Sequence, residues 1–316
     1  GGNRFNKADL RSFAVYGQGS YEFSDQFKAT LGLRWTEDKL NAVFSQVPYP
    51  VLGALPPTAN SARFREVTGR AALEFRPAED ILLYAQASRG FNVTGFNAVS
   101  GVGPVPITPE IIYAYEGGVK SAFADGRVVL NLAGFYNDYQ NLNQTQVVGA
   151  TSVTDTGGAR ILGVEAEAVL RPVDRLRINL SFAYLDATYQ NFNFTNPLTG
   201  ATASLDGNRL VRAPRLSGSA GAEYAFPLGG EWTLTPRVDV YAQGRVFYRA
   251  DNNPALQGSS FTRTNATLSL RAPENRFSVE AFVENLENDT QITNLTASFP
   301  QLGGFPLATF SAPRTY

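Results

Sequence analysis

A two-residue alternation of apolar and polar side chains, sustained over unusually long segments, is the feature that most limits what this chain can fold into. From Val128 to Tyr136 every second residue is apolar or glycine, and Asn131 lies between them. This period indicates a strand, and the Asp125-Gly126 pair before it indicates a hairpin. A strand in a soluble sheet is typically about 5–6 residues long. These segments are longer, so we expect a structure that requires long hairpins.

The same unit recurs along the chain, at 27–35, 67–75, 176–184 and 232–242 among other places. The connections between units alternate in length. Short connections lie at 24–26, 78–80, 124–126, 173–175, 228–231 and 273–275, and long ones rich in Pro, Gly, Asn and Thr lie at 45–62, 92–109, 191–213, 250–260 and 294–310. Short turns at one end of a sheet and long loops at the other are typical of a transmembrane β-barrel of the outer-membrane type.

The two expected faces fit a membrane better than a water-soluble sandwich or propeller, which is the alternative. Hydrocarbon requires every backbone group to be paired, so a spanning sheet has to close into a barrel. We expect lipid to contact Leu31, Leu33, Leu130, Leu132, Leu180, Phe182, Val238 and Val240, with Trp35, Tyr136, Tyr184, Tyr224 and Trp232 as an interfacial girdle. The other face is expected to line a wet or protein-filled lumen, with Arg34, Arg70, Glu116, Lys120, Glu165, Glu167, Arg177 and Arg237. So many ionisable groups are incompatible with a dry core.

Composition excludes several functions. The 316 residues have a formal net charge of −1, which argues against a nucleic-acid partner, and contain no cysteine, histidine or methionine. Histidine-based catalysis and most transition-metal sites are therefore excluded within this stretch, and we expect neither an enzyme nor a bound cofactor. The Asn-Asp pairs at 137–138 and 288–289 lack the spacing of a calcium-binding loop, so no metal site is expected.

The pattern predicts about thirteen strands. Their expected ranges are 11–23, 27–44, 62–77, 81–92, 110–123, 127–148, 152–171, 175–190, 212–226, 230–249, 259–272, 276–292 and 309–316. The first and last strands both run toward the short-turn end, whereas bacterial barrels have an even number of strands. We therefore expect residues 1–316 to be one part of a barrel whose earlier strands and final residues lie elsewhere.

Several short motifs resemble TonB-dependent outer-membrane receptors, in an order and spacing that cover nearly the whole chain. They are YAQASRGF at 84–91 with GFN at 95–97, TPE at 108–110, YEGGVKS at 115–121, FYNDY at 135–139, GGARILGVEAE at 157–167, VENL at 283–286 with NDT at 288–290, and PRTY at 313–316. The resemblance implies an all-β, antiparallel transmembrane β-barrel of about 22 strands with an N-terminal plug. Residues 1–316 would supply about thirteen of its C-terminal strands, without the plug.

The resemblance also implies a function and partners. The family resides in the outer membrane of Gram-negative bacteria, among lipid and lipopolysaccharide, and takes up scarce nutrients with energy delivered through TonB. A ferric siderophore is the expected substrate, and the absence of histidine mildly disfavours haem. The alternative is a passive, porin-like channel. The TonB complex would act through the N-terminal segment, and the plug and remaining strands would complete the barrel.

Aromatic, Arg and Asn residues gather where predicted strands enter long loops, and these are our candidates for ligand binding. Such side chains can stack on and pair with an acidic, aromatic iron chelate, although an aromatic girdle or loop packing would produce a similar pattern. The candidates are Arg89, Phe91, Asn92, Phe96, Asn97, Tyr189, Phe192, Tyr248 and Arg249.

Overall fold

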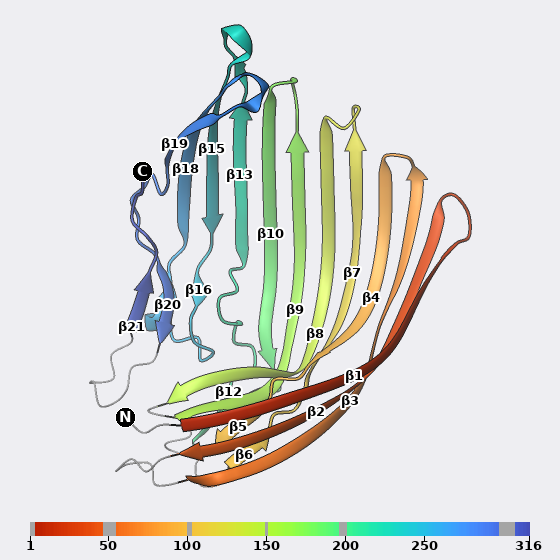
Figure 1. Ribbon diagram of the computed structural model, residues 1–316, viewed down its shortest axis with the longest axis vertical. Helices are drawn as coiled ribbons and strands as arrows, with labels where there is room; N and C mark the ends of the chain where they lie inside the picture. Colours follow the sequence, from red (N-terminus) through yellow and green to blue (C-terminus); the bar gives the residue numbers. More distant parts are fainter. Residues whose placement is uncertain (1–3, 47–54, 100–102, 149–150, 196–200, 297–306) are drawn as a thin grey trace.

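One curved antiparallel sheet dominates the computed structural model, which describes residues 4–46, 55–99, 103–148, 151–195, 201–296 and 307–316 (Figure 1). Its strands pair in chain order from β1 to β19. They are β1 (Arg4–Glu22), β2 (Phe27–Gln46), β3 (Leu55–Ala78), β4 (Ile81–Asn92), β7 (Glu110–Phe123), β8 (Val128–Val148), β9 (Thr151–Leu170), β10 (Leu176–Gln190), β13 (Leu216–Tyr224), β15 (Thr233–Gln243), β18 (Phe261–Arg271) and β19 (Ser278–Val283). Within the described residues, β1 and β19 are the two edges of an open sheet.

The register sorts side chains into an apolar outer face and a polar inner face. Residues directly opposite each other in an antiparallel pair point to the same side of the sheet. Leu132 lies opposite Val119 and Ala166, and Ala166 lies opposite Phe182. The neighbouring row on the other side joins Lys120, Asn131, Glu167 and Ser181. The predicted alternation is confirmed in this row pair, and the outer leucines are solvent-exposed in the isolated chain.

Aromatic rings on the outer face lie near both ends of the strands. At the short-turn end Phe27 stacks on Phe75 with ring centroids 4.3 Å apart, and Trp232 meets Phe277 edge-on at 5.6 Å. At the long-loop end Phe13 and Trp35 lie 6.2 Å apart, and Tyr115 and Tyr136 lie 6.3 Å apart. Two such girdles flank the apolar band of a membrane barrel.

The tight turns lie at one end of the sheet and the long loops at the other, as predicted (Figure 1). In the turn after β7, Asp125 and Gly126 have φ of 55° and 76°, which is the left-handed conformation that the Asp-Gly pair indicated. Helical structure among the described residues is limited to three-residue 3₁₀ turns: η1 (Gly229–Glu231), η2 (Pro254–Leu256) and η3 (Pro273–Asn275). No helix in the described ranges is long and apolar enough to cross a membrane.

Several predicted loops contain strands. β2 and β3 continue together to Gln46 and Leu55, so most of the predicted 45–62 loop that the structure describes is a hairpin beyond the membrane band. Two-stranded ribbons occupy other loops: β5 (Phe96–Val99) with β6 (Gly103–Pro106), β11 (Asn193–Thr195) with β12 (Thr202–Ser204), and β16 (Val246–Phe247) with β17 (Gln257–Gly258). The Pro, Gly and Asn residues correctly predicted bends in these segments, but the sequence pattern did not predict the short paired strands between the bends.

The predicted strands at 276–292 and 309–316 need correction. β19 ends at Val283, because Asn285 and Asn288 adopt φ of 58° and 54° and turn the chain. β20 (Ile292–Thr296) then pairs with β21 (Leu307–Phe310) in a separate ribbon. The bridge between Glu284 and Thr315 joins the last residues to the end of the wall, and hydrogen bonds of Ala312 and Arg314 with Asn285 and Leu286 accompany it. The sheet contains thirteen strands, but the thirteenth is the two-residue β14 (Phe226–Pro227), which pairs with β15.

Packed cores form only at the loop end of the described chain. Tyr189, Phe192, Leu205 and Ala250 make one cluster under the loops. The second packing region lies on the inner face of the β2–β3 extension, where Leu40, Ala42 and Phe44 are buried and β6 packs alongside. These contacts hold loop segments against one another and against the sheet at its long-loop end.

Candidate functional site: the inner face and mouth of the barrel

A concavity of about 570 Å³ lies mainly on the inner face of β1–β4, toward the loop end. The charged and aromatic residues in its lining are Tyr16, Arg34, Asp38, Arg70, Arg89 and Phe91. Arg34 lies opposite Tyr16 in the register, and Arg70 lies opposite Ser88, so the alternation directs Tyr16, Arg34 and Arg70 to the inner face. Arg89 and Phe91 belong to the alternate series of β4, with Ala87, and border the concavity where β3 separates from β4. The site is therefore built by four consecutive strands.

Arg34 and Arg70 supply positive charge to this concavity. The Arg34 guanidinium lies over the Tyr16 ring at 5.9 Å from its centroid, and its Nε donates to Thr36 Oγ1 at 3.0 Å. Arg70 Nε donates to Gln86 Oε1 at 2.9 Å. All of these partners are neutral, and within the described part of the chain neither arginine forms an ion pair. Their charge is available to a bound anion.

Arg89 occupies the fork where β3 separates from β4. The pairing between these strands ends at Gly69 and Arg89, while β3 continues outward with β2. Arg89 Nη2 bonds Glu66 Oε2 at 2.7 Å, Nε donates to the Tyr113 hydroxyl at 3.2 Å, and Nη1 donates to the Val67 carbonyl. These three partners hold the Arg89 side chain in place and neutralise its charge, so that Arg89 links β3 to β7 at the loop end of the wall. The sequence pattern did not indicate this structural role.

The next predicted ligand residues hold the first loop in place. Asn97 Nδ2 donates to the Thr154 carbonyl at 2.8 Å, and Asn97 Oδ1 accepts from the Thr154 amide at 3.0 Å. Asn92 Nδ2 donates to Glu110 Oε2 at 3.1 Å. Phe96 lies in the β5–β6 ribbon opposite Pro106, and Phe91 remains partly exposed beside the concavity. Of this group, Phe91 is the side chain that lines the concavity.

Tyr189 and Phe192 lie inside the loop cluster. Both have 0% exposure, and their rings meet edge-on at 5.2 Å. Tyr189 donates from its hydroxyl to Gln144 Oε1 at 2.9 Å, and burial raises its pKa to about 12. Their contacts in this structure are with other loop residues. The packing explanation, which sequence could not distinguish from ligand binding, fits this geometry.

Tyr248 and Arg249 bind neighbouring loop residues. The Tyr248 hydroxyl donates to the Ile292 carbonyl, which joins two long loops. Arg249 forms an ion pair with Asp251 at 3.1 Å. Both side chains are half-buried, and they lie outside the lining of the β1–β4 concavity.

The rest of the inner face carries polar groups with different degrees of pairing. The Tyr84 hydroxyl donates to Glu116 Oε1 at 2.7 Å, and Lys120 Nζ lies 5.6 Å from the centre of the same ring. Glu165 and Glu167 are exposed on β9. This part of the wall resembles a structural hydrogen-bonding surface with two acidic groups open to the lumen.

Near the short-turn end, Arg237 is ion-paired, whereas the described hydrogen-bond partner of Arg177 is neutral. Arg237 Nη1 bonds Glu223 Oε2 at 2.8 Å, and its Nε bonds Asp239 Oδ2 at 2.6 Å. Arg177 donates only to Asn179 Oδ1, at 3.1 Å, among the hydrogen bonds described. Tyr16, Glu66 and Glu223 were not among the sequence-based candidates, because only the cross-strand register brings them beside these arginines.

The two-faced antiparallel sheet, its aromatic girdles and its one-sided loops define the wall of a transmembrane β-barrel. A family model described as TonB dependent receptor-like, beta-barrel matches residues 1–286. The chain therefore belongs to the TonB-dependent receptors, a family of transporters of the Gram-negative outer membrane. The resemblance seen in the sequence motifs is confirmed.

Individual relatives support this assignment. The metal-pseudopaline receptor CntO of Pseudomonas aeruginosa is 25% identical over 224 residues, which cover 71% of this chain and 30% of that protein. The probable TonB-dependent siderophore receptor PiuA of Acinetobacter baumannii is 25% identical, over 87% of this chain and 39% of its own length. The chain thus spans 30% to 39% of the length of these relatives.

The fold matches solved receptor structures. The ferric yersiniabactin uptake receptor FyuA of Yersinia pestis superposes with a TM-score of 0.84 at 21% identity, over 99% of this chain and 45% of FyuA.

No group of His, Cys, Asp and Glu within the described residues is arranged to hold a metal ion.

Proposed function

We propose that this chain forms part of an outer-membrane receptor that takes up a ferric siderophore. The observation that carries the proposal is the concavity beside the loops, where Arg34 and Arg70, which form no ion pair among the described residues, outnumber the carboxylate of Asp38 and lie with Tyr16 and Phe91 in the same lining. A guanidinium pairs with carboxylate or catecholate oxygens, and an aromatic ring stacks on a planar chelate. PiuA is named as a siderophore receptor and FyuA as a ferric yersiniabactin uptake receptor, which supports the same class of cargo.

The complete receptor would contain about 22 strands and a plug. In this proposal residues 1–316 contribute the later strands, and the open inner face meets the plug. Exposed Glu165 and Glu167 would form part of that contact. TonB would supply the energy through the segment that precedes the plug. A passive porin-like channel is the competing function, and it differs in requiring neither TonB nor a defined ligand site.

Uptake of radiolabelled ferric siderophores by cells that carry the full-length protein tests the proposal. Catecholate, hydroxamate and carboxylate complexes are offered separately, with and without TonB. We expect saturable uptake of at least one class, lost without TonB. Equal uptake in cells that lack TonB would instead establish a passive channel.

The ligand site is tested with Arg34→Gln and Arg70→Gln. Each loses a charge-assisted hydrogen bond to the chelate, so binding should weaken about tenfold or more. Arg177→Gln is the matched control, because Arg177 lies on the same face near the short-turn end. Unchanged affinity in both rim variants would remove this concavity from the ligand path.

A further inference from the structure

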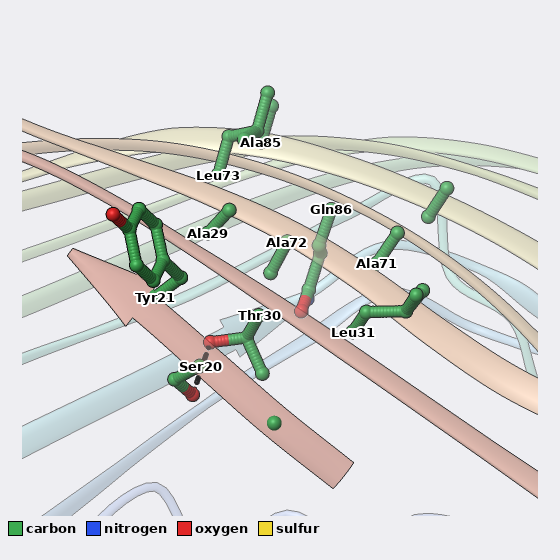
Figure 2. Close-up of a pocket in the computed structure, with 12 residues that line it drawn as sticks. Ser20, Tyr21, Ala29, Thr30, Leu31, Ala71, Ala72, Leu73, Ala85 and Gln86 are labelled. Atoms are coloured by element: carbon green, nitrogen blue, oxygen red, sulfur yellow. Dashed lines mark hydrogen bonds between the residues drawn. The ribbon is translucent and has the colours of Figure 1, made fainter. Parts of the chain in front are cut away.

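The loop-end part of β3 has an open backbone edge. Its pairing with β2 continues along the whole extension, whereas its pairing with β4 ends at Gly69 and Arg89. Figure 2 shows the closed region before this fork, where Leu73 of β3 and Ala85 of β4 lie on the same side of the sheet. Beyond the fork, residues 59–67 of β3 pair with β2 alone in the described part of the sheet.

The odd-numbered residues of this segment direct their backbone groups to the open edge. Successive residues of an antiparallel strand bond the neighbour on one side and then the neighbour on the other. The Val67 carbonyl accepts from Arg89 Nη1 across the fork, so Val67 and every second residue outward face the open side. Within the described residues, the backbone N–H and C=O groups of Arg65 and Arg63 therefore lack a partner strand. Such an edge is a template for a further strand.

The open edge is long enough for a polypeptide strand. From Val67 to Ala59 it spans about 26 Å at roughly 3.3 Å per residue. The neighbouring ribbon strand β6 contacts β3 through the inner face, where Asn60 Nδ2 donates to the Pro104 carbonyl at 2.8 Å. A small chelate would cover only part of this length, whereas a strand of about 5–6 residues or more fits it.

Cations flank the open edge on the outer face. In the register Arg65 lies opposite Glu37, and Arg63 lies opposite Lys39. Glu37 Oε2 lies 2.8 Å from Arg65 Nε and 3.8 Å from Arg63 Nη1, and Glu37 Oε1 lies 3.2 Å from Lys39 Nζ. Three cations around one carboxylate leave a net charge of +2 (3 − 1). The side chains of Arg65 and Arg63 are 59% and 52% exposed, so an added strand can reach them.

These charges determine which kind of strand fits the edge. Two copies of this chain meeting edge to edge would place Arg63 and Arg65 beside the same cations, and like charges opposite each other destabilise a sheet. A strand with acidic residues at every second position would instead pair with both arginines. Its alternate side chains would lie on the inner side, beside Ala62 and Phe64.

We propose that the edge of β3 from Ala59 to Val67 binds an extended, acidic segment of a partner protein outside the cell, which adds to the sheet as a further strand. The acidic residues would meet Arg63 and Arg65 and would exchange backbone hydrogen bonds with them. The long loops of outer-membrane barrels face the exterior, so the partner is an extracellular protein.

This surface does not depend on the nature of the transported ligand. Arg34 and Arg70, which carry the siderophore proposal, belong to the concavity before the fork and are not part of the open edge. A failure of the siderophore proposal would leave the strand-binding edge standing, and the reverse also holds.

The test measures binding of a short synthetic peptide, in which Glu and Val alternate, to the full-length protein in detergent. Fluorescence anisotropy of the labelled peptide gives the affinity. We expect saturable binding, and binding at least about tenfold weaker when Lys replaces Glu, because each exchange turns an attractive cross-strand pair into a repulsive one.

Two N-methylated peptides test strand addition directly. In the proposed register each Glu N–H faces β3, and each Val N–H faces away from it. Methylation of the Glu nitrogens removes the hydrogen bonds to the edge, so binding should weaken at least about tenfold. Methylation of the Val nitrogens should leave the affinity nearly unchanged. The two peptides have the same charge, so their difference reports the backbone contacts.

Variants of the protein locate the contact on β3. Arg63→Gln should weaken binding by up to about fivefold, the range for one opposite-charge pair across a sheet. Arg63→Pro also removes the N–H that faces the open edge, where proline is tolerated, and should bind about tenfold more weakly than Arg63→Gln. Arg276→Gln is the charge control, because it removes an exposed arginine near the short turns, which pairs with Glu274. Heat-modifiability on gels verifies that each variant is folded.

Four results would overturn the proposal. Absence of saturation up to about 1 mM peptide would show that the edge is closed. Equal affinities of the two N-methylated peptides would exclude addition as a strand. Equal effects of Arg276→Gln and Arg63→Gln would show that position on the barrel is irrelevant. A dimer of the protein that Arg63→Pro dissociates would show that a second copy occupies the edge. The N-methylated peptides are compared on the unmodified protein, so they decide the question even if Arg63→Pro fails to fold.

Discussion

A lysine introduced at position 132 of β8 should lower the free energy of unfolding far more than a lysine introduced at the adjacent position 133, because the two positions lie on opposite faces of the wall. Leu132 is 48% exposed on the outer face, in a row with Val119, Ala166 and Phe182. It is the middle residue of the outer-face series from Val128 to Tyr136, so it lies near the centre of the apolar band. Leu132→Lys therefore places an ammonium group in hydrocarbon.

The expected cost is about 2–4 kcal/mol, the range for a lysine on the lipid face at the bilayer midplane. This corresponds to roughly a 30- to 900-fold change in the folding equilibrium constant. Ala133→Lys is the matched control, because position 133 lies opposite Glu165 on the inner face. There the ammonium group meets a carboxylate and water, and stability should change by less than about 1 kcal/mol.

The assay is reversible denaturant unfolding of the full-length protein in phospholipid vesicles, monitored by tryptophan fluorescence. The difference between the two variants is the informative quantity, since both add the same side chain to the same strand. Similar free energies of unfolding for Leu132→Lys and Ala133→Lys would refute the assignment of the faces. A larger loss for Ala133→Lys would mean that the register of β8 is shifted by one residue.

Three further predictions concern packing and pH. Phe192→Ala should open the loop cluster, at a cost of about 3–5 kcal/mol, and should appear as faster proteolysis of the 191–213 loop with the barrel intact. Gly118→Ala should destabilise the wall by about 1–3 kcal/mol in vesicle unfolding, because the added Cβ would lie 2.6 Å from the Leu132 carbonyl oxygen. Gly134→Ala is the control, since a Cβ at Gly134 meets nothing closer than 4.0 Å. A large effect of Gly134→Ala would contradict the reasoning. Tyr189 has a pKa raised from 10.0 to about 12 by burial, so the stability that its neutral form contributes is complete below pH 10 and is lost as the pH rises from 10 to 12. Proteolysis of the loops at pH 11 should therefore exceed that at pH 9 in the native protein, and Tyr189→Phe should abolish the difference.

Local pattern carried most of the information about the wall. The alternation around Leu132 and Asn131 determined both faces, because a strand can place successive side chains only on opposite sides. The Asp125-Gly126 pair located a hairpin, since it readily adopts positive φ. The absence of histidine and cysteine excluded histidine- and cysteine-based catalysis and most transition-metal sites within these 316 residues, without any knowledge of tertiary contacts. These properties depend on residues close in sequence, so the sequence alone was sufficient.

The tertiary structure decided which side chains are partners and which are free. Tyr189 and Phe192 were predicted as ligand-binding aromatics, and the structure packs them with Leu205 and Ala250 in the loop cluster. Arg89 was predicted beside them, and the fork between β3 and β4 brings Glu66 next to it.

The end of the chain shows the same limit. The residues from 307 to 310 have strand propensity, but their partner is the nearby segment from 292 to 296 and not the wall. The choice between a local ribbon and a long-range pairing depends on loop closure and on packing at the mouth, and neither is encoded in a two-residue period. The sequence by itself determined the two faces and the hairpins of this barrel wall. Only the tertiary structure decided which residues its loops bury, which charges they neutralise and which remain open to a ligand, because those outcomes arise from contacts between segments far apart in the chain.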